Sequence, residues 1–367
     1  MTTRREALKL GGAAALGLLT SHGGTVSAET GQTKIKVAGY AYDRVQAIKD
    51  GKLGVEQVGV SFHESNIYRM NDLAFGPEKT YEVTELGLIP YVTKYINDGF
   101  RGYTLIPVFI SRTFRHRNIY VHVESGIEKP EDLRGRKVGT PGYGSSANTW
   151  VRGMLYDQYG VAAKDIQWIE ATRSSDISGV VSSSNGAGSR YHLPDNFPLS
   201  QGPPGIDESE LLLSGACDAL VTPITPKAFE EGNPKIRQLF SPLKPAEQQY
   251  YRDTGIFPIM HVVGVRADVA ADNPWLPAAV FKMYSEAKKA AYANLATTTV
   301  LRTSLPWAAE EYEETRQLMG DDYWRYGIEA NRKELQSVMR YTHEQGLVKR
   351  SGDFVELFHP ETLRLIG

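Results

Sequence analysis

Residues 111–117 (SRTFRHR) are the densest group of side chains in this sequence that could do chemistry. They follow an apolar stretch, 105–109, whose composition is typical of a strand. Guanidinium groups bind a carboxylate through two parallel hydrogen bonds, and a neighbouring histidine can give or take a proton near neutral pH. We therefore expect Arg112 and Arg115 to bind an anionic substrate and His116 to be a catalytic acid or base. The alternative is that one or two of these arginines face solvent.

Glu85 and His261 are two further titratable candidates. Glu85 lies at a predicted turn from a strand into a helix, and we expect it to act as a catalytic base or to bind a substrate hydroxyl; its alternative role is to cap that helix. His261 adjoins an apolar strand, where a lone histidine is more often structural than catalytic, and it is kept as a candidate substrate contact. Because these residues and His116 lack the local spacing of metal ligands, we predict no metal ligand set and no cofactor, although the sequence leaves a divalent metal open.

A glycine- and serine-rich turn at residues 140–148 precedes a predicted helix at 149–159. Free N–H groups and the positive end of the dipole at such a turn suit a carboxylate or phosphate, so Ser145 and Ser146 are candidate substrate contacts; the alternative is simple helix capping. Aromatic side chains that could form flat walls around a substrate ring, or else belong to the core, are Tyr40, Tyr42, Tyr143 and Trp150. The turn lacks the Gly-Lys pair of a phosphate loop.

The elements that must position these residues are short strands, each followed by a polar turn and a helix. In an open α/β sheet, ligand groups gather at the carboxyl ends of such strands. We predict strands at 34–38, 58–62, 81–83, 105–109, 118–123, 218–222 and 262–265, and helices at 66–75, 281–294, 309–319 and 328–345. The serine-, glycine- and proline-rich stretch 174–205 is predicted to be a long irregular loop.

Two of these strands are predicted to cross between lobes. They divide the chain into a first lobe, 29–118 plus 263–367, and a second lobe, 119–262. Ligand groups at strand ends in both lobes indicate an α/β fold of the type II periplasmic-binding-protein kind, with two lobes, a central cleft and two hinge crossings. A fold of this kind does not by itself specify an activity.

The first 28 residues have the pattern of a twin-arginine export signal. Arg4 and Arg5 precede a short, weakly apolar run, 10–19, and residues 26–28 (VSA) form a small-x-small cleavage site. The run is about half the ~20 residues needed to cross a bilayer, so no membrane anchor is expected. We therefore expect a periplasmic or secreted protein.

The composition is that of an ordinary soluble globular protein, with 41% hydrophobic and 23% charged residues and a net charge of −2 in 367 residues. Because there is no basic excess, nucleic acid is not an expected partner. Cys217 is the only cysteine, which excludes an intrachain disulfide and a cysteine-based metal cluster, and its apolar surroundings predict a buried side chain. No zinc-protease motif, nucleotide-binding loop or serine-hydrolase elbow occurs.

Several stretches together resemble the 4,5-dihydroxyphthalate decarboxylase family, which is related to periplasmic solute-binding proteins. The stretches, in order along the chain, are 42–44 (YDR), 106–109 (IPVF), 114–116 (FRH), 150–153 (WVRG), 251–261, 305–307 (LPW), 319–324 (MGDDYW) and 330–332 (ANR). The resemblance implies a lyase that removes carbon dioxide from a hydroxylated aromatic dicarboxylate. Such a reaction needs cations for the carboxylates, a proton donor at the departing carbon and a group that stabilises charge on a ring oxygen.

The export signal and the insert at 182–205 depart from what the resemblance implies for an intracellular catabolic enzyme. The export signal favours an alternative, a solute-binding protein that captures an aromatic or other small carboxylate by lobe closure and delivers it to an ABC-type permease. A third, weaker alternative is a scavenging protein that binds pyrimidine-like compounds.

Overall fold

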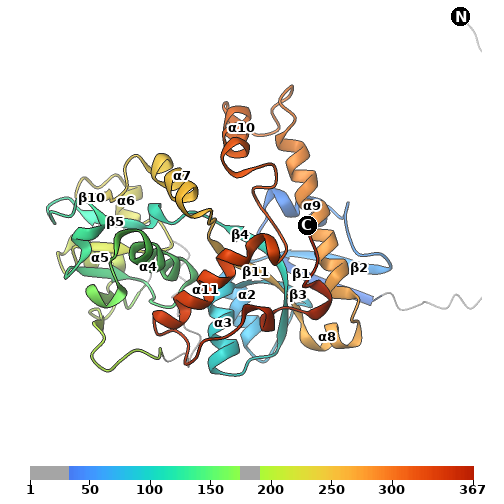
Figure 1. Cartoon of the computed structure of the whole chain (residues 1–367), viewed down its shortest axis with the longest axis horizontal. Helices are drawn as coiled ribbons and strands as arrows, with labels where there is room; N and C mark the ends of the chain where they lie inside the picture. Colours follow the sequence, from blue (N-terminus) through green and yellow to red (C-terminus); the bar gives the residue numbers. More distant parts are fainter. Residues whose placement is uncertain (1–32, 174–190) are drawn as a thin grey trace, which may run out of the picture. The chain divides into compact units, whose positions relative to one another are not determined.

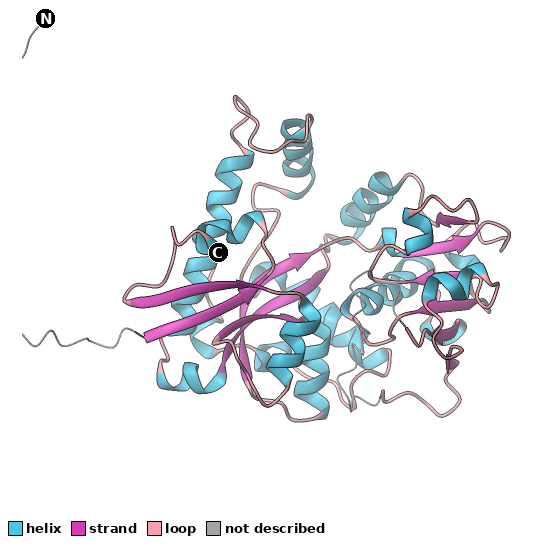
Figure 2. Cartoon of the chain, turned by 180° about the vertical axis from the view of Figure 1, so that it is seen from behind, coloured by secondary structure: helices cyan, strands magenta, loops and turns pink. Residues whose placement is uncertain are grey.

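The computed structural model describes residues 33–173 and 191–367 (Figure 1). The predicted export signal and residues 174–190 of the predicted loop lie outside these ranges. The described residues belong to one compact unit. The strands form two separate sheets, drawn in magenta in Figure 2.

The first sheet has the strand order β2-β1-β3-β11-β4. Its members are β1 (Thr33–Gly39), β2 (Val58–Glu64), β3 (Val83–Gly87), β4 (Tyr103–Arg112) and β11 (Ile259–Arg266). β1 is parallel to β2 and β3, whereas β11 is antiparallel to β3 and β4. The domain boundary predicted between residues 262 and 263 therefore falls inside β11, which pairs along its length within this sheet.

The second sheet has the order β10-β5-β9-β6-β7-β8. Its members are β5 (Ile119–His122), β6 (Lys137–Thr140), β7 (Gln167–Glu170), β8 (Leu199–Gln201), β9 (Ala219–Val221) and β10 (Ile236–Gln238). β8 lies in the stretch predicted to be irregular; three residues pairing with β7 give too short a pattern to detect in a Ser/Pro-rich sequence. Cys217 is buried beside this sheet, as predicted.

Helices cover both sheets (Figures 1 and 2). They are α1 (Gln46–Lys49), α2 (Ile67–Phe75), α3 (Leu88–Asn97), α4 (Ser146–Tyr159), α5 (Glu208–Leu213), α6 (Lys227–Glu230), α7 (Leu243–Thr254), α8 (Ala267–Asp272), α9 (Leu276–Leu295), α10 (Ala308–Met319) and α11 (Arg332–Glu344). The apolar periodicity of the C-terminal third correctly predicted α9, α10 and α11. Asn66 caps α2, and Ser145 caps α4, by accepting a backbone N–H through the side chain.

Two apolar clusters hold the first sheet. One joins residues of β1, β4 and β11 to α9, with Val37, Val265 and Phe281 among its members. The other contains residues of β3, α3, α4 and α11 and extends to strands of the second sheet. Burial of such side chains stabilises the fold by about 1.5–3 kcal/mol each before chain entropy is subtracted.

Gly153 makes the close packing of α4 and α11 feasible. A Cβ atom at this position would lie 2.3–2.5 Å from ring carbons of Tyr341, which is itself buried. Because neither helix can move without disturbing the core, we expect Gly153→Ala to lower the free energy of unfolding by about 1–3 kcal/mol in urea titrations. Gly232→Ala is a poor control although Gly232 is exposed with open space around it, because its positive φ of 73° would itself strain an alanine. The double variant Gly153→Ala, Tyr341→Leu is the better control, since it removes the clash. Equal stability of Gly153→Ala and the wild type would contradict the prediction.

Candidate functional site

Glu85 is the centre of a polar cluster within the first sheet. It lies in the middle of β3 and is 1% exposed. The sequence had predicted a turn at this position, and that prediction is wrong. β3 is buried on every residue because it is an inner strand between β1 and β11, so its short sequence VTELG shows no alternation that would mark it. Glu85 therefore does not cap α3, whose N-cap is Gly87.

The Glu85 carboxylate has three protein partners. Oε1 accepts a hydrogen bond from the Tyr42 hydroxyl at 2.8 Å and lies 2.5 Å from Nδ1 of His261. Oε2 accepts from the backbone N–H of Tyr40 at 3.2 Å. With its oxygens already in use, Glu85 is suited to hold its neighbours in place and poorly suited to act as a free base.

The registers of β1, β3 and β11 bring these residues together. Ala38 pairs with Thr84, so the chain leaves β1 immediately beside Glu85. The approach is close at this exit, since a Cβ on Gly39 would lie 3.3 Å from Oε2 of Glu85. On the other side of β3, Val263 pairs with Glu85 and His261 pairs with Gly87. The strand ends thus place two aromatic side chains and one imidazole around one buried carboxylate.

His261 has one nitrogen engaged and one available. Nδ1 contacts Glu85, and within the described part of the chain Nε2 makes no hydrogen bond. The His261 side chain is 17% exposed, whereas that of Glu85 is 2% exposed. The Tyr40 ring stacks with the imidazole at a centroid distance of 6.2 Å and an angle of 18°. A carboxylate at Nδ1 fixes the ring and directs Nε2 toward a reactant.

Tyr42 completes the Glu85 cluster, which we define as Tyr40, Tyr42, Glu85 and His261. Burial, followed by the neighbouring Glu85 charge, raises the pKa of Tyr42 far above its ordinary value, so its hydroxyl stays protonated and donates. The side chain of Ser111 also contacts this hydroxyl. The structure therefore joins three of the predicted residues, Tyr42, Glu85 and His261.

Ser145 and Ser146 lie where two helices begin. Ser145 is the N-cap of α4, and the Ser146 hydroxyl accepts a hydrogen bond from the backbone N–H of Ile89 in the first turn of α3 at 3.3 Å. The positive ends of α3 and α4 therefore lie next to each other. Because Gly87, the N-cap of α3, pairs with His261, this region adjoins the Glu85 cluster.

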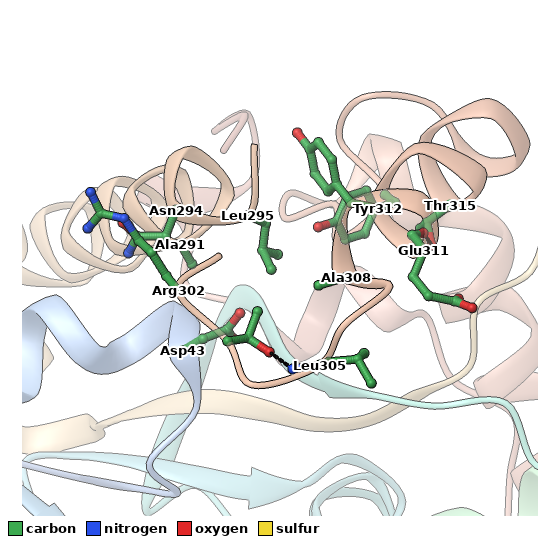
Figure 3. Close-up of a pocket in the computed structure, with 12 residues that line it drawn as sticks. Asp43, Ala291, Asn294, Leu295, Arg302, Leu305, Ala308, Glu311, Tyr312 and Thr315 are labelled. Carbon is green, nitrogen blue, oxygen red and sulfur yellow. Dashed lines mark hydrogen bonds between the residues drawn. The ribbon is translucent and has the colours of Figure 1, made fainter. Parts of the chain in front are cut away.

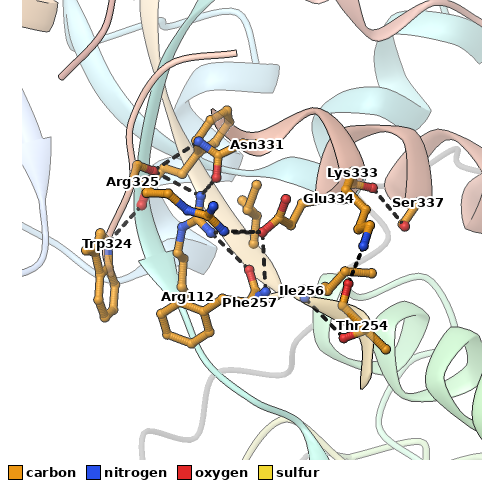
Figure 4. Close-up of polar contacts among 12 residues, drawn as sticks. Arg112, Thr254, Ile256, Phe257, Trp324, Arg325, Asn331, Lys333, Glu334 and Ser337 are labelled. Carbon is orange, nitrogen blue, oxygen red and sulfur yellow. Dashed lines mark hydrogen bonds and ion pairs between the residues drawn. The ribbon is translucent and has the colours of Figure 1, made fainter. Parts of the chain in front are cut away.

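Arg112 is held by the protein itself (Figure 4). It is 4% exposed, at the end of β4, and donates to the carbonyl oxygens of Phe257 and Arg325 at 3.0 Å each and to the side chain of Asn331. Its Nη1 also lies 3.6 Å from the Glu334 carboxylate. A guanidinium with these partners has little capacity for the substrate carboxylate predicted from the sequence.

Arg115 and His116 lie in the segment that follows β4. Nε of Arg115 contacts the sulfur of Met260 at 3.0 Å, and Nη1 donates to Asn118 at 3.2 Å. His116 is 1% exposed and packs edge-on against the rings of Phe240 and Tyr250. Within the described ranges neither residue contacts Glu85 or His261, so the structure does not join them to the cluster.

His116 is expected to make stability depend on pH. Burial depresses its pKa from 6.5 to about 4, so the unfolded chain takes up this proton first. The contribution of His116 to the free energy of unfolding should therefore be fully present above pH 6.5. It should be lost as the pH drops toward 4, which lowers the free energy of unfolding by roughly 3 kcal/mol at most. His116→Leu should remove this part of the slope in urea titrations between pH 7 and pH 4; an unchanged slope would contradict it.

Tyr143 is fully buried and packs against the rings of Trp168, Tyr191 and Phe197. The Arg152 guanidinium lies 3.7 Å from the Tyr143 ring centroid. The backbone N–H of Tyr143 donates to the Glu170 carboxylate at 2.7 Å. Trp150 is likewise buried, and its indole N–H donates to the carbonyl of Ile259 at 2.8 Å. Both aromatic residues therefore sit in the core, the alternative that the sequence left open, whereas Tyr40 and Tyr42 face the Glu85 cluster.

The described residues contain neither a candidate metal site nor a candidate membrane span. No group of three or more His, Cys, Asp and Glu side chains gathers there in a way that could hold a metal ion. No helix in these ranges is long and apolar enough to cross a membrane. A cavity of about 500 Å³ lies between the end of α9 and α10 (Figure 3), with Leu295, Arg302, Tyr312 and Tyr323 in its wall; it contains none of the Glu85 cluster.

Comparison with known proteins identifies the family. A 4,5-dihydroxyphthalate decarboxylase from Comamonas testosteroni is 34% identical over 335 residues, which are 90% of this chain and 97% of that protein. The chain belongs to the 4,5-dihydroxyphthalate decarboxylase family. A second member, from Pseudomonas putida, is 30% identical over 213 residues, 58% of this chain and 78% of its own length. Residues 109–186 also match the family described as NMT1/THI5 like. The resemblance drawn from the sequence is therefore confirmed.

Solved structures with similar folds include binding proteins and an enzyme. The aliphatic sulphonate binding protein SsuA of Escherichia coli aligns with 91% of this chain and 99% of its own, at 15% identity and a TM-score of 0.49. The desulfurization enzyme DSZB with biphenyl-2-sulfinic acid aligns with 90% and 98%, at 15% identity and a TM-score of 0.48. The two sheets, each covered by helices, confirm the α/β fold class predicted from the sequence.

Proposed function

We propose that this chain catalyses the non-oxidative decarboxylation of a hydroxylated aromatic carboxylate of the phthalate type, with 4,5-dihydroxyphthalate as the first substrate to test. The relatives with this name support it. The observation that carries it is the pairing of His261 with a buried carboxylate, which leaves Nε2 available to a reactant.

The reaction needs one proton at the ring carbon that bears the departing carboxylate. In the proposed step, Nε2 of His261 gives its proton to that carbon, and the bond between the ring and the carboxylate breaks. Carbon dioxide leaves, and the electron pair of the broken bond restores the aromatic ring. A ring hydroxyl para to this carbon supplies electron density that stabilises the protonated ring. One proton is consumed for each carbon dioxide released.

Glu85, Tyr42 and Tyr40 support this step without reacting. Glu85 fixes the imidazole through Nδ1, while the Tyr42 hydroxyl and the Tyr40 N–H hold the carboxylate. The Tyr40 ring, stacked on the imidazole, offers a flat surface beside it for the substrate ring. The adjoining positive ends of α3 and α4 favour an anionic substrate at this edge of the sheet.

We extend the proposal to the place of action and to cofactors. The twin arginines and cleavage site in residues 1–28 support export to the periplasm, and a fusion of these residues to a reporter, with Arg4 and Arg5 changed to lysine as the control, tests it. The proposed step requires no organic cofactor. Adding and chelating divalent metal during the assay tests whether a metal contributes.

The deciding experiment incubates the purified chain with 4,5-dihydroxyphthalate in D₂O. We expect carbon dioxide release and a product with one deuterium at the vacated ring carbon, measured by NMR. Phthalate, which lacks the hydroxyls, should not turn over. Thermal stabilisation by 4,5-dihydroxyphthalate without carbon dioxide release would overturn the proposal in favour of a solute-binding protein. No stabilisation and no turnover would overturn the substrate class as well.

A further inference from the structure

Arg44 packs against Tyr42, a member of the Glu85 cluster, and we call its contacts with Tyr42, Trp324 and Ile110 the clamp. Its guanidinium carbon lies 4.0 Å from the ring centroid of Tyr42 and 3.9 Å from that of Trp324, so that one planar cation faces two rings. Nε and Nη2 both donate to the carbonyl oxygen of Ile110, at 2.8 and 2.5 Å. The Arg44 side chain is 12% exposed.

Trp324 and Ile110, which hold the Arg44 guanidinium, are themselves held in place. The indole N–H of Trp324 donates to the carbonyl of Phe109 at 3.0 Å, and its backbone N–H donates to the Tyr292 hydroxyl at 2.7 Å. Phe109 and Ile110 belong to β4, immediately before Ser111, whose side chain contacts the Tyr42 hydroxyl. The clamp thus connects the segment after β1 to β4 and to residue 324.

We propose that Arg44 is a positioning residue for decarboxylation: stacked on Trp324 and bonded to Ile110, it holds the Tyr42 ring so that its hydroxyl donates to Glu85. This inference rests on the proposed function. Among the described residues, the other ring that contacts the Tyr42 ring is that of Tyr40, at a centroid distance of 5.6 Å and an interplanar angle of 45°. If the ring turned, Glu85 would lose a donor and His261 would lose its fixed orientation.

The chemistry of arginine is necessary for this role. A planar guanidinium can stack on two rings and still direct two N–H groups in its plane at one carbonyl. A lysine ammonium at the same place keeps the charge but cannot make both sets of contacts. The cation also draws electron density from the phenol ring, which makes the Tyr42 hydroxyl a better hydrogen-bond donor to Glu85.

The chain contains a matched control in Arg101. Its guanidinium carbon lies 3.4 Å from the Tyr95 ring centroid, and its Nη1 donates to the carbonyls of Tyr95 and Phe100. Like Arg44, Arg101 faces an aromatic ring and donates to backbone carbonyls, but it is exposed, faces one ring and has no contact with the Glu85 cluster within the described residues. Arg44→Lys should lower kcat by about tenfold with KM nearly unchanged, whereas Arg101→Lys should leave both constants unchanged.

A double-mutant cycle with Tyr42→Phe decides the matter. If Arg44 acts through the Tyr42 hydroxyl, Arg44→Lys should have no further effect on kcat once that hydroxyl is gone. If the effects multiply in the double variant, or if Arg44→Lys has full activity, this inference is wrong even though the wild type is active. A wild type that releases no carbon dioxide would contradict the proposed function and this inference together.

Discussion

Replacing His261 by asparagine is expected to lower kcat for carbon dioxide release by about 10²–10⁴, the usual contribution of a positioned general acid. KM should change little, because the imidazole acts on the ring carbon during the step and does not hold the substrate carboxylates. The variant should fold normally, since the His261 side chain is partly exposed and asparagine can still donate toward Glu85.

The matched control for this prediction is His63→Asn. His63 is an exposed histidine of β2 that contacts Ser61 and the Tyr81 ring, outside the Glu85 cluster, and its replacement should leave kcat unchanged. His116→Asn separates the two histidine hypotheses, because the sequence predicted that residue to be catalytic. If His116→Asn abolishes turnover in folded protein while His261→Asn does not, the assignment made here is wrong.

Part of this site was predictable from the sequence. The strand-turn-helix pattern places Tyr40 and Tyr42 directly after β1, and position at the carboxyl end of a strand is a general signal for ligand contact. That signal drew attention to Tyr42 and Glu85, which the structure joins by a hydrogen bond. The element boundary was wrong for Glu85, because a completely buried inner strand does not alternate and its last residues look like a turn.

The partnership of Glu85 with His261 had no local signal. The two residues are 176 positions apart, and they meet only because β11 returns to pair with β3. Residue-type reasoning instead favoured the charged segment 111–117, where three cations lie close together in the sequence. The sequence of β4 does not indicate that Arg112 is buried in an ion pair. Its partner Glu334 comes from α11, at the other end of the chain, so no local pattern links the two residues.

Removing either member of the Arg112–Glu334 pair is expected to destabilise the protein strongly. Both side chains are almost completely buried, with 0% and 2% exposure, and Glu334 also lies 3.6 Å from Nη2 of Arg325 and accepts from the backbone N–H of Phe257 at 3.3 Å (Figure 4). Glu334→Ala or Arg112→Ala should each lower the free energy of unfolding by about 3–5 kcal/mol, because the remaining charge stays buried without its partner. Urea titration near pH 7 measures this loss.

Two comparisons show whether burial of the pair is the cause. The exposed pair of Lys244 and Glu311 is the control, since Lys244→Ala should cost no more than about 1 kcal/mol. The double variant Arg112→Met, Glu334→Leu should regain much of the stability lost in the single variants, because both charges are gone and the volume is kept. Arg112→Met that retains full stability but raises KM by two orders of magnitude would instead support the substrate-binding role predicted from the sequence. The partners of Arg112 argue against that outcome, since the protein itself occupies both terminal nitrogens of its guanidinium.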